Sequence, residues 1–310
     1  MYKNYKNIVN INRPMDYACL EENLLELRGR FGFLNKSVIG WSYLGKNINL
    51  IRIGRGERKV IYIGAHHAME WITSLMLVRF IEDFCKSYVF KEKFYGYDPE
   101  YILQTRSIYI VPMLNPDGVD LSINGIDKYN YLMRSRLVRM NNCSEDFSHW
   151  QANARGVDLN HNYDADFYLL KDIEIKSGIT EPCGTRYGGE YAESEPEVAS
   201  LASFIRSDGD ISLLAALHTQ GEVVYWKYKD IIPKKAKILA DLIAKATGYK
   251  LEDPEEEIAS YGGCKDWFIS KFNRPGFTIE CGKGINPIPV SDFVKIYNYI
   301  AEALTLLFMN

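Results

Sequence analysis

The chain of 310 residues lacks several features that mark particular classes of protein. It has no excess of positive charge, because its formal net charge is −3 and its pI is near 6.0. A nucleic-acid partner usually requires a basic, clustered surface, so we expect none here. No run approaches the roughly 18–20 apolar residues of a spanning helix, and we expect no membrane partner. The first residues, 1–7, lack the apolar core of a secretory signal peptide.

Paired cysteines and internal repeats are also missing. The six cysteines are scattered and form no C-x-x-C pair, which fits reduced thiols better than a disulfide framework. Together with the missing signal peptide, this leads us to expect a cytoplasmic protein. We find no repeat, low-complexity tract or linker, so we expect one domain over residues 1–310, in which residues 1–15 form a polar N-terminal segment.

Apolar runs of two kinds alternate along the chain. Short runs rich in β-branched residues predict strands, and longer runs with helical spacing predict helices. The predicted helices cover residues 17–31, 196–205, 234–247 and 290–308, and a further helix begins within residues 64–72 and continues to about residue 88. The predicted strands cover residues 60–63, 107–113, 211–217 and 277–280, and residues 38–53 are predicted to form a hairpin. Residues 119–155 and 164–190 show little periodicity and predict irregular loops, the first a functional loop or lid. Alternating strands and helices indicate an α/β fold, with a sheet covered by helices.

A nine-residue stretch, Gly64–Ile72, lies where a predicted strand becomes a predicted helix. His67 and Glu70 are three residues apart, so on one helical turn their side chains share a face. His218 follows a later strand. Each feature alone is commonplace, since a histidine at a sheet edge or an H-x-x-E pattern arises by chance. Together they supply two imidazoles and a carboxylate, a catalytic zinc set whose fourth position is left to water.

Glu280 ends the predicted strand at 277–280. Such a glutamate is often a solvated rim residue, but three apolar residues precede it and suggest a buried strand whose last side chain faces the sheet mouth. A carboxylate there can take a proton from zinc-bound water and pass it to a leaving amine. Because zinc lowers the pKa of its water to about 7, a glutamate can act as this base near neutrality.

These residues give the chain a resemblance to the zinc carboxypeptidases of the carboxypeptidase A type, over nearly its whole length. The matching segments are His67–Ile72, Asn115–Gly118, Gly156–Asn160, His218, and Gly262-Gly263 with Asp266-Trp267 before Glu280. The resemblance implies a metallocarboxypeptidase-like fold with a central mixed, twisted β-sheet flanked by helices. It implies one Zn²⁺ held by His67, Glu70 and His218, with Glu280 as general base. Asp158 falls where the family has a carboxylate that orients the first zinc histidine. We expect Asn115–Gly118 to be a structural turn.

The sequence departs from the family pattern at two arginines. The family has Asn-Arg where this chain has Asn160-His161, and a histidine cannot reproduce the planar fork with which arginine grips a carboxylate. The family arginine that polarises the scissile carbonyl is replaced by Gln151. Either Gln151 donates a hydrogen bond there or Arg155 provides the charge, and spacing does not decide between them.

Two further positions concern the substrate pocket. The tyrosine that covers the pocket in the family is replaced by Ile258, with Tyr261 three residues on. Lys265 stands at the position that sets side-chain preference in the family. A lysine in the pocket favours a substrate that carries a carboxylate; the alternative is a surface lysine beside Asp266 that keeps its ammonium in water.

The context of Asn160-His161 and of Tyr261–Trp267 resembles one branch of the family, the γ-D-glutamyl-meso-diaminopimelate peptidases, which trim bacterial cell-wall peptides. This resemblance implies a zinc peptidase that hydrolyses the γ-D-glutamyl–meso-diaminopimelate bond of small muropeptides. Gln151, Arg155, Asn160, His161, Tyr261 and Lys265 are the candidate substrate-binding residues. The alternatives are a general zinc carboxypeptidase and a non-catalytic relative that binds peptides. We assign no role to His66 or His149.

Overall fold

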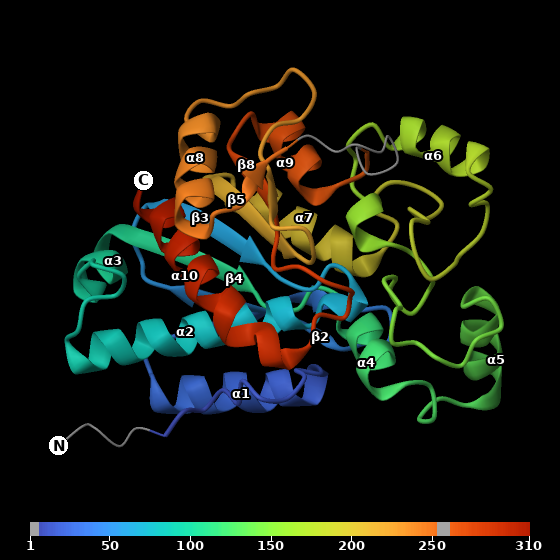
Figure 1. The fold of residues 1–310 in the computed structure, drawn as a ribbon, viewed down its shortest axis with the longest axis horizontal. Helices are drawn as coiled ribbons and strands as arrows, with labels where there is room; N and C mark the ends of the chain where they lie inside the picture. The colour runs from blue at the N-terminus through green and yellow to red at the C-terminus, as the bar shows by residue number, and fades with distance from the viewer. Residues whose placement is uncertain (1–5, 253–260) are drawn as a thin grey trace.

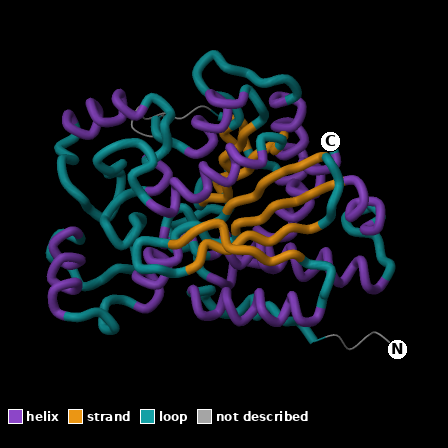
Figure 2. Tube along the Cα trace, turned by 180° about the vertical axis from the view of Figure 1, so that it is seen from behind, coloured by secondary structure: helices purple, strands orange, loops and turns teal. Residues whose placement is uncertain are grey.

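The computed structural model describes residues 6–252 and 261–310. In these residues one mixed sheet has the strand order β1-β2-β4-β3-β5-β8-β6-β7 (Figures 1 and 2). Its strands are β1 (Asn35–Trp41), β2 (Asn47–Ile53), β3 (Arg58–Ile63), β4 (Arg106–Val111), β5 (Ile211–His218), β6 (Val223–Tyr225), β7 (Lys250–Leu251) and β8 (Gly276–Glu280). The central strands β4, β3, β5 and β8 run parallel to one another. The pairs β1-β2, β2-β4 and β8-β6 are antiparallel, and β7 pairs with β6 in parallel. The carboxyl ends of the parallel strands therefore meet at one edge.

Helices cover both faces of this sheet. They are α1 (Tyr17–Arg30), α2 (Ile72–Phe90), α3 (Pro99–Thr105), α4 (Pro116–Asn124), α5 (Tyr131–Met140), α6 (Phe167–Lys176), α7 (Pro196–Asp208), α8 (Ala236–Thr247), α9 (Cys264–Phe272) and α10 (Phe293–Met309). Short 3₁₀ turns are η1 (Ala68–Glu70), η2 (Leu159–His161) and η4 (Val290–Asp292). Figure 1 shows α5 and α6 at the end of the molecule opposite α3.

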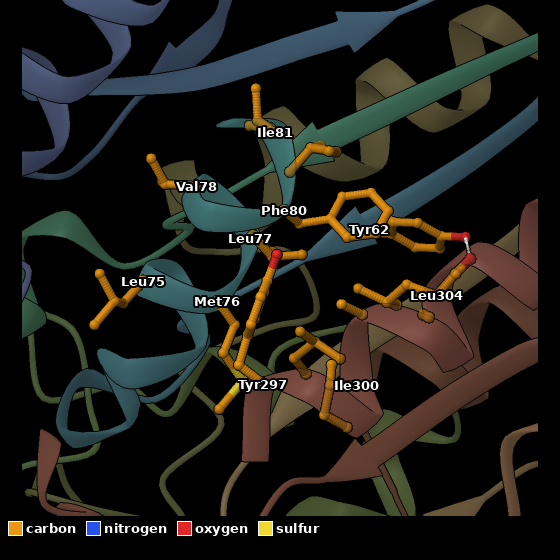
Figure 3. Packing of buried hydrophobic residues seen from close by; sticks show 14 of the residues in the cluster. Tyr62, Leu75, Met76, Leu77, Val78, Phe80, Ile81, Tyr297, Ile300 and Leu304 are labelled. Atoms are coloured by element: carbon orange, nitrogen blue, oxygen red, sulfur yellow. Dashed lines mark hydrogen bonds between the residues drawn. The ribbon is translucent and has the colours of Figure 1, made fainter. Parts of the chain in front are cut away.

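The run Val60-Ile61-Tyr62-Ile63 is wholly buried because each face of β3 packs against helices. Successive side chains of a strand point to opposite faces. Val60 and Tyr62 belong to the core formed with α1, α2, α8 and α10, while Ile61 and Ile63 belong to the core formed with α7 and α9. Figure 3 shows Tyr62 between α2 and α10, where its hydroxyl donates a hydrogen bond of 2.7 Å to the Leu304 carbonyl. The sheet is thus the middle layer of three.

The segment before α1 is polar in sequence but partly packed in the structure. Val9 and Met15 are buried, and the N–H groups of Ile8 and Val9 donate to the Glu82 carboxylate at 2.8 and 3.0 Å. A third hydrophobic core is formed by Ala68 and by buried side chains within residues 121–154. Within the described ranges, no helix combines the length and apolar character of a membrane span.

The predicted α/β fold with a mixed sheet and flanking helices is confirmed. Two predictions of irregular structure are wrong, because α4 and α5 occupy much of 119–155 and α6 lies within 164–190. The expected turn at Asn115–Gly118 is also wrong: Asn115 caps α4 and its side chain accepts from the Gly118 N–H at 2.9 Å. Proline at the first helical position explains why a turn signature begins a helix here.

Candidate metal centre and substrate pocket

The loop after β3 carries the first two candidate metal ligands. Ala65 adopts φ +46° and redirects the chain at the strand end. Asn115 holds the loop from the next strand, because its N–H donates to the Ala65 carbonyl and its side-chain amide to the His66 carbonyl. His67 is extended and only Ala68–Glu70 forms a 3₁₀ turn, so the predicted helical turn starts one residue late. His67 and Glu70 still meet, with Nδ1 and Oε1 2.8 Å apart.

His218 completes this group from the end of β5. Its Nδ1 lies 3.0 Å from Glu70 Oε2 and 3.2 Å from His67 Nδ1, and its ring is buried with 1 % exposure. The three side chains offer donor atoms within 4.8 Å of one another. The predicted ligand set therefore comes together from two parallel strand ends.

These side chains fit a zinc ion. Two nitrogens held at 2.0–2.1 Å in a tetrahedral site are about 3.3 Å apart, which is close to the Nδ1–Nδ1 distance of 3.2 Å found here. Glu70 Oε2 is buried and accepts no hydrogen bond from the described residues. Although burial lowers the pKa of His67, the carboxylates of Glu70 and Asp158 raise it well above its usual range. The same negative charge favours a bound cation.

Asp158 lies behind His67, as the family resemblance implies. Its Oδ1 is 3.1 Å from His67 Nε2, so the ring donates from Nε2 and keeps the Nδ1 lone pair for a metal. Burial opposes the charged form of Asp158, but His67 and His161 outweigh it and hold the pKa of this carboxyl well below its usual range. Asp158 is thus an anionic acceptor that fixes the tautomer of His67.

Glu280 sits beside the metal ligands at the end of β8. It is paired in register with His218 of β5, and side chains in register on parallel strands share a face of the sheet. Thr278, two residues earlier, points to that face as well, and both residues line the pocket. Loss of hydration and the nearby carboxylate of Glu70 raise the pKa of Glu280 to about 8. Positive charge at the metal ligands would lower the pKa of Glu280.

A pocket of about 190 Å³ opens onto these groups. It is lined by His67, Gln151, Asp158, Asn160, His161, Arg186, Tyr225, Gly263, Lys265, Asp266, Thr278 and Glu280. Polar and charged side chains dominate this lining. The pocket therefore suits a small, strongly polar substrate.

Three of the predicted substrate-binding residues line the pocket beside Lys265. Gln151 accepts from the Thr185 hydroxyl at Oε1, which leaves its Nε2 as a donor. Asn160 accepts from the Cys264 N–H at Oδ1, 3.0 Å away, and likewise keeps its amide donors. His161 Nδ1 donates to the Arg186 carbonyl at 3.1 Å.

Two other predicted substrate-binding residues are not among those that line the pocket. Arg155 extends to Glu195, 3.7 Å away, and over the ring of Tyr43, so the structure favours Gln151 over Arg155 beside the metal centre. Tyr261 packs near the ammonium of Lys229. Ile258, the expected site of the covering tyrosine, lies outside the described residues.

Lys265 is buried rather than a surface lysine, with 4 % exposure. Its ammonium donates to the Lys227 carbonyl at 2.8 Å and forms an ion pair with Asp266. Gly262 allows this segment to approach the chain near Asn160, since a Cβ there would lie 2.4 Å from the His161 carbonyl oxygen. The pocket thus contains a paired positive and negative charge.

The sequence alone did not identify Arg186, Tyr225, Thr278 or Asp266 as pocket residues. Of these, only Thr278 had a usable signal, because it precedes Glu280 by two positions on a predicted strand. His66 is buried, stacks on the ring of His218 with centroids 5.3 Å apart, and contacts the Tyr163 hydroxyl at 3.0 Å. His149 is exposed and outside the pocket.

Comparison with known proteins agrees with this geometry. A family profile described as zinc carboxypeptidase matches residues 24–302. The chain is 34 % identical over 290 residues to gamma-D-glutamyl-L-diamino acid endopeptidase 1 of Lysinibacillus sphaericus, covering 94 % of this chain and 71 % of the relative. It is 28 % identical over 300 residues to carboxypeptidase A1 of Bos taurus, covering 90 % and 62 %. The structure of bovine thrombin-activatable fibrinolysis inhibitor bound to tick carboxypeptidase inhibitor has the same fold, with a TM-score of 0.76 at 19 % identity and coverage of 96 % and 97 %.

Proposed function

The chain belongs to the zinc carboxypeptidase family of metallopeptidases, and on that premise we propose that it hydrolyses the γ-D-glutamyl–meso-diaminopimelate bond of small cell-wall peptides. The observation that carries the proposal is the 34 % identity, over 94 % of this chain, to a gamma-D-glutamyl-L-diamino acid endopeptidase. An activity on such a bond requires a pocket for a leaving residue that carries more than one charged group.

The pocket chemistry supports this substrate class. Meso-diaminopimelate carries an ammonium and a carboxylate at the end of its side chain. Lys265 and Asp266 present one charge of each sign to the pocket, and exchange of their mutual contact for contacts to a zwitterion keeps both charges paired. An aromatic or aliphatic residue offers no such exchange and leaves the pair partly desolvated without compensation.

The chain's own groups carry out the hydrolysis as follows. Bound Zn²⁺ supplies Lewis acidity, which acidifies water and polarises the scissile carbonyl. Glu280 takes a proton from the attacking water, whose oxygen bonds to the carbonyl carbon. The C–N bond then breaks, and Glu280 delivers the proton to the leaving amine. The Gln151 amide is the candidate donor to the carbonyl oxygen, in the role that the family gives to arginine.

The test is incubation of the zinc-loaded protein with L-Ala-γ-D-Glu-meso-diaminopimelate, followed by chromatographic detection of free diaminopimelate. The matched peptide that ends in L-lysine lacks only the distal carboxylate and tests the pocket. Release from a peptide such as hippuryl-phenylalanine, without release from the tripeptide, would instead identify a general carboxypeptidase. Zinc binding and peptide binding without any turnover would identify a non-catalytic relative.

A cytoplasmic location remains a prediction from the scattered cysteines. All six are free thiols in the structure, and reduced thiols are usual for cytosolic proteins. On this basis we propose released muropeptides, rather than intact wall, as the substrate pool. Cell fractionation, followed by detection of the protein in each fraction with an antibody raised against it, would test the cytoplasmic location. Recovery of the protein in the culture medium would contradict that location.

A further inference from the structure

The ammonium of Lys265 is held in the pocket by two contacts of different kinds. It pairs with the Asp266 carboxylate and donates a hydrogen bond of 2.8 Å to the main-chain carbonyl of Lys227. An ammonium has three N–H donors, so a third can reach a substrate carboxylate. When substrate replaces the Asp266 contact, the Lys227 carbonyl is the neutral group that keeps the ammonium in place. The position of this carbonyl therefore decides where Lys265 meets its ligand.

The carbonyl belongs to a short turn, residues 227–231, that follows β6. Within it, Tyr228 and Ile231 form an antiparallel bridge, with hydrogen bonds of 3.3 and 2.9 Å between their main chains. The ring of Tyr228 is buried in the core formed with α7 and α9, and the Lys265 ammonium lies 5.9 Å from the centroid of this ring. A shift of Tyr228 would therefore move the carbonyl that precedes it in the chain.

The side chain of Asp166 binds this turn from another segment. The Tyr228 hydroxyl donates to Asp166 Oδ2, and the Lys229 ammonium donates to the same oxygen at 2.6 Å. Burial, and after it the hydrogen bond to Asp166, raise the pKa of Tyr228 well above its usual range. The hydroxyl therefore keeps its proton and remains a donor. One carboxylate oxygen thus holds two successive residues of the turn.

Asp166 does not have the role that its place in the sequence would give it. It precedes α6, and an aspartate at that position usually accepts from an N–H of the first helical turn. Within the described chain its carboxylate caps no such N–H, and its backbone is left-handed, with φ +51°, a region that few residues other than glycine adopt. Just before it, the Ala165 carbonyl accepts from the Gly262 N–H at 2.8 Å. Asp166 is thus joined both to the segment that carries Lys265 and to the turn that holds its ammonium.

We propose that Asp166 is a positioning residue for substrate specificity: it holds the turn at 227–231 so that the Lys265 ammonium faces the distal carboxylate of the leaving diamino acid. The inference rests on the proposed function for the identity of that ligand. Asp166 acts through Tyr228 and Lys265 rather than by contact with the substrate. Its loss therefore weakens recognition of the carboxylate and leaves the metal ligands and Glu280 as they are.

The experiment measures KM and kcat of zinc-loaded variants for two tripeptides, one ending in meso-diaminopimelate and one in L-lysine. We expect Asp166→Ala to raise KM for the diaminopimelate peptide about 2- to 10-fold, the effect of one weakened hydrogen bond. Its kcat, and its KM for the lysine peptide, should match those of the parent. Asp166→Asn keeps an acceptor for the Tyr228 hydroxyl and should recover most of the affinity. Asp164→Ala is the matched control, because the exposed Asp164 carboxylate pairs with Lys271 at 2.7 Å.

Two further variants test whether Asp166 acts through the contacts described. Tyr228→Phe removes the hydroxyl but keeps the buried ring, and it should raise KM for the diaminopimelate peptide selectively even if Asp166→Ala does not fold. In a Lys265→Met background, Asp166→Ala should cause no further rise in KM, because residues that act through one another are not additive. A further rise of the full size in this double variant would overturn the inference.

Calorimetry with free meso-diaminopimelate and L-lysine separates failure of this inference from failure of the proposed function. If the parent releases no diaminopimelate from the tripeptide, the proposed function fails, and the binding comparison still tests Asp166. The parent should bind diaminopimelate more tightly than lysine, and Asp166→Ala and Tyr228→Phe should lose this preference. Retention of the preference in both variants, or a parent without it, would overturn the inference. An equal loss in Asp164→Ala or in Asp166→Asn would also overturn it, since the effect would then be one of charge rather than of position.

Discussion

Asp158→Asn tests the link between the pocket wall and the metal centre. The carboxylate accepts three hydrogen bonds, from His67 Nε2, the Asn160 N–H and the Arg186 N–H, each at 3.1 Å. An asparagine has one oxygen to accept them. If this oxygen faces His67, the new NH₂ group opposes the Arg186 N–H. If the amide is reversed, its NH₂ opposes His67 Nε2–H and favours the tautomer in which Nδ1 carries the proton and cannot bind metal.

Either arrangement should weaken zinc binding. Loss of an acceptor behind a metal-binding histidine costs about 10- to 100-fold in metal affinity, which corresponds to about 1.4–2.7 kcal/mol. The assay is competition for zinc with a chromophoric chelator, with Asp172→Asn as control because Asp172 is exposed on α6. Zinc affinity of Asp158→Asn equal to that of the parent and the control would refute the assigned role of Asp158.

Four further outcomes are expected. Glu280→Gln should lower kcat by a factor of about 10² to 10⁴, the usual contribution of a general base, while zinc content by atomic absorption stays at one per chain; unchanged kcat would remove Glu280 as base. Lys265→Met should raise KM for the diaminopimelate peptide more than for the lysine-ending peptide, because only the first carries the distal carboxylate. An equal rise in KM for both peptides would show that Lys265 does not contact this carboxylate. Burial raises the pKa of the Glu197 carboxyl to about 7, whereas the same group in the unfolded chain has a pKa near 4.5. Between these two pH values the folded protein keeps the carboxyl proton and the unfolded chain has lost it. Stability should therefore fall between about pH 4.5 and 7 by on the order of 3 kcal/mol, and urea titrations of Glu197→Gln should show a smaller fall; the same slope in both proteins would contradict the shift. Chelation should lower Tm and added Zn²⁺ restore it, because only the folded state assembles the ligands; a Tm indifferent to zinc would argue against the site.

The metal centre was predictable because its residues follow strong local patterns. His67 and Glu70 are close in sequence, and His218 and Glu280 each end an apolar strand. Parallel strands bring such ends to one edge of a sheet, so pattern and topology lead to the same place. The contact between His67 and Glu70 was predicted correctly but for the wrong reason. His67 is extended and a 3₁₀ turn follows it, so the two side chains do not meet on an α-helical turn.

Several of the missed elements have weak local signals. Asp166 begins α6 in a left-handed conformation and its side chain makes no cap. Strands β6 and β7 have three and two residues, which is too short for an alternating pattern to be read. One signal was overlooked: Asn130 caps α5 by accepting from the Met133 N–H at 3.0 Å, and asparagine is a strong helix-capping residue.

The pocket was only partly predictable for a different reason. Its wall depends on long-range hydrogen bonds between irregular segments, such as those from Arg186 to Asp158 and His161. No local rule relates residue 186 to either partner. The burial of Lys265 also depends on the tertiary fold, because its neutralising contacts come from Asp266 and from the Lys227 carbonyl on another segment.

Product analysis of the tripeptide reaction tests the central claim most directly. Zinc-loaded protein should convert L-Ala-γ-D-Glu-meso-diaminopimelate into L-Ala-D-Glu and free meso-diaminopimelate, and neither product should form when the zinc is chelated beforehand. Recovery of the intact tripeptide from zinc-loaded protein that cleaves an ordinary C-terminal peptide bond would contradict the account.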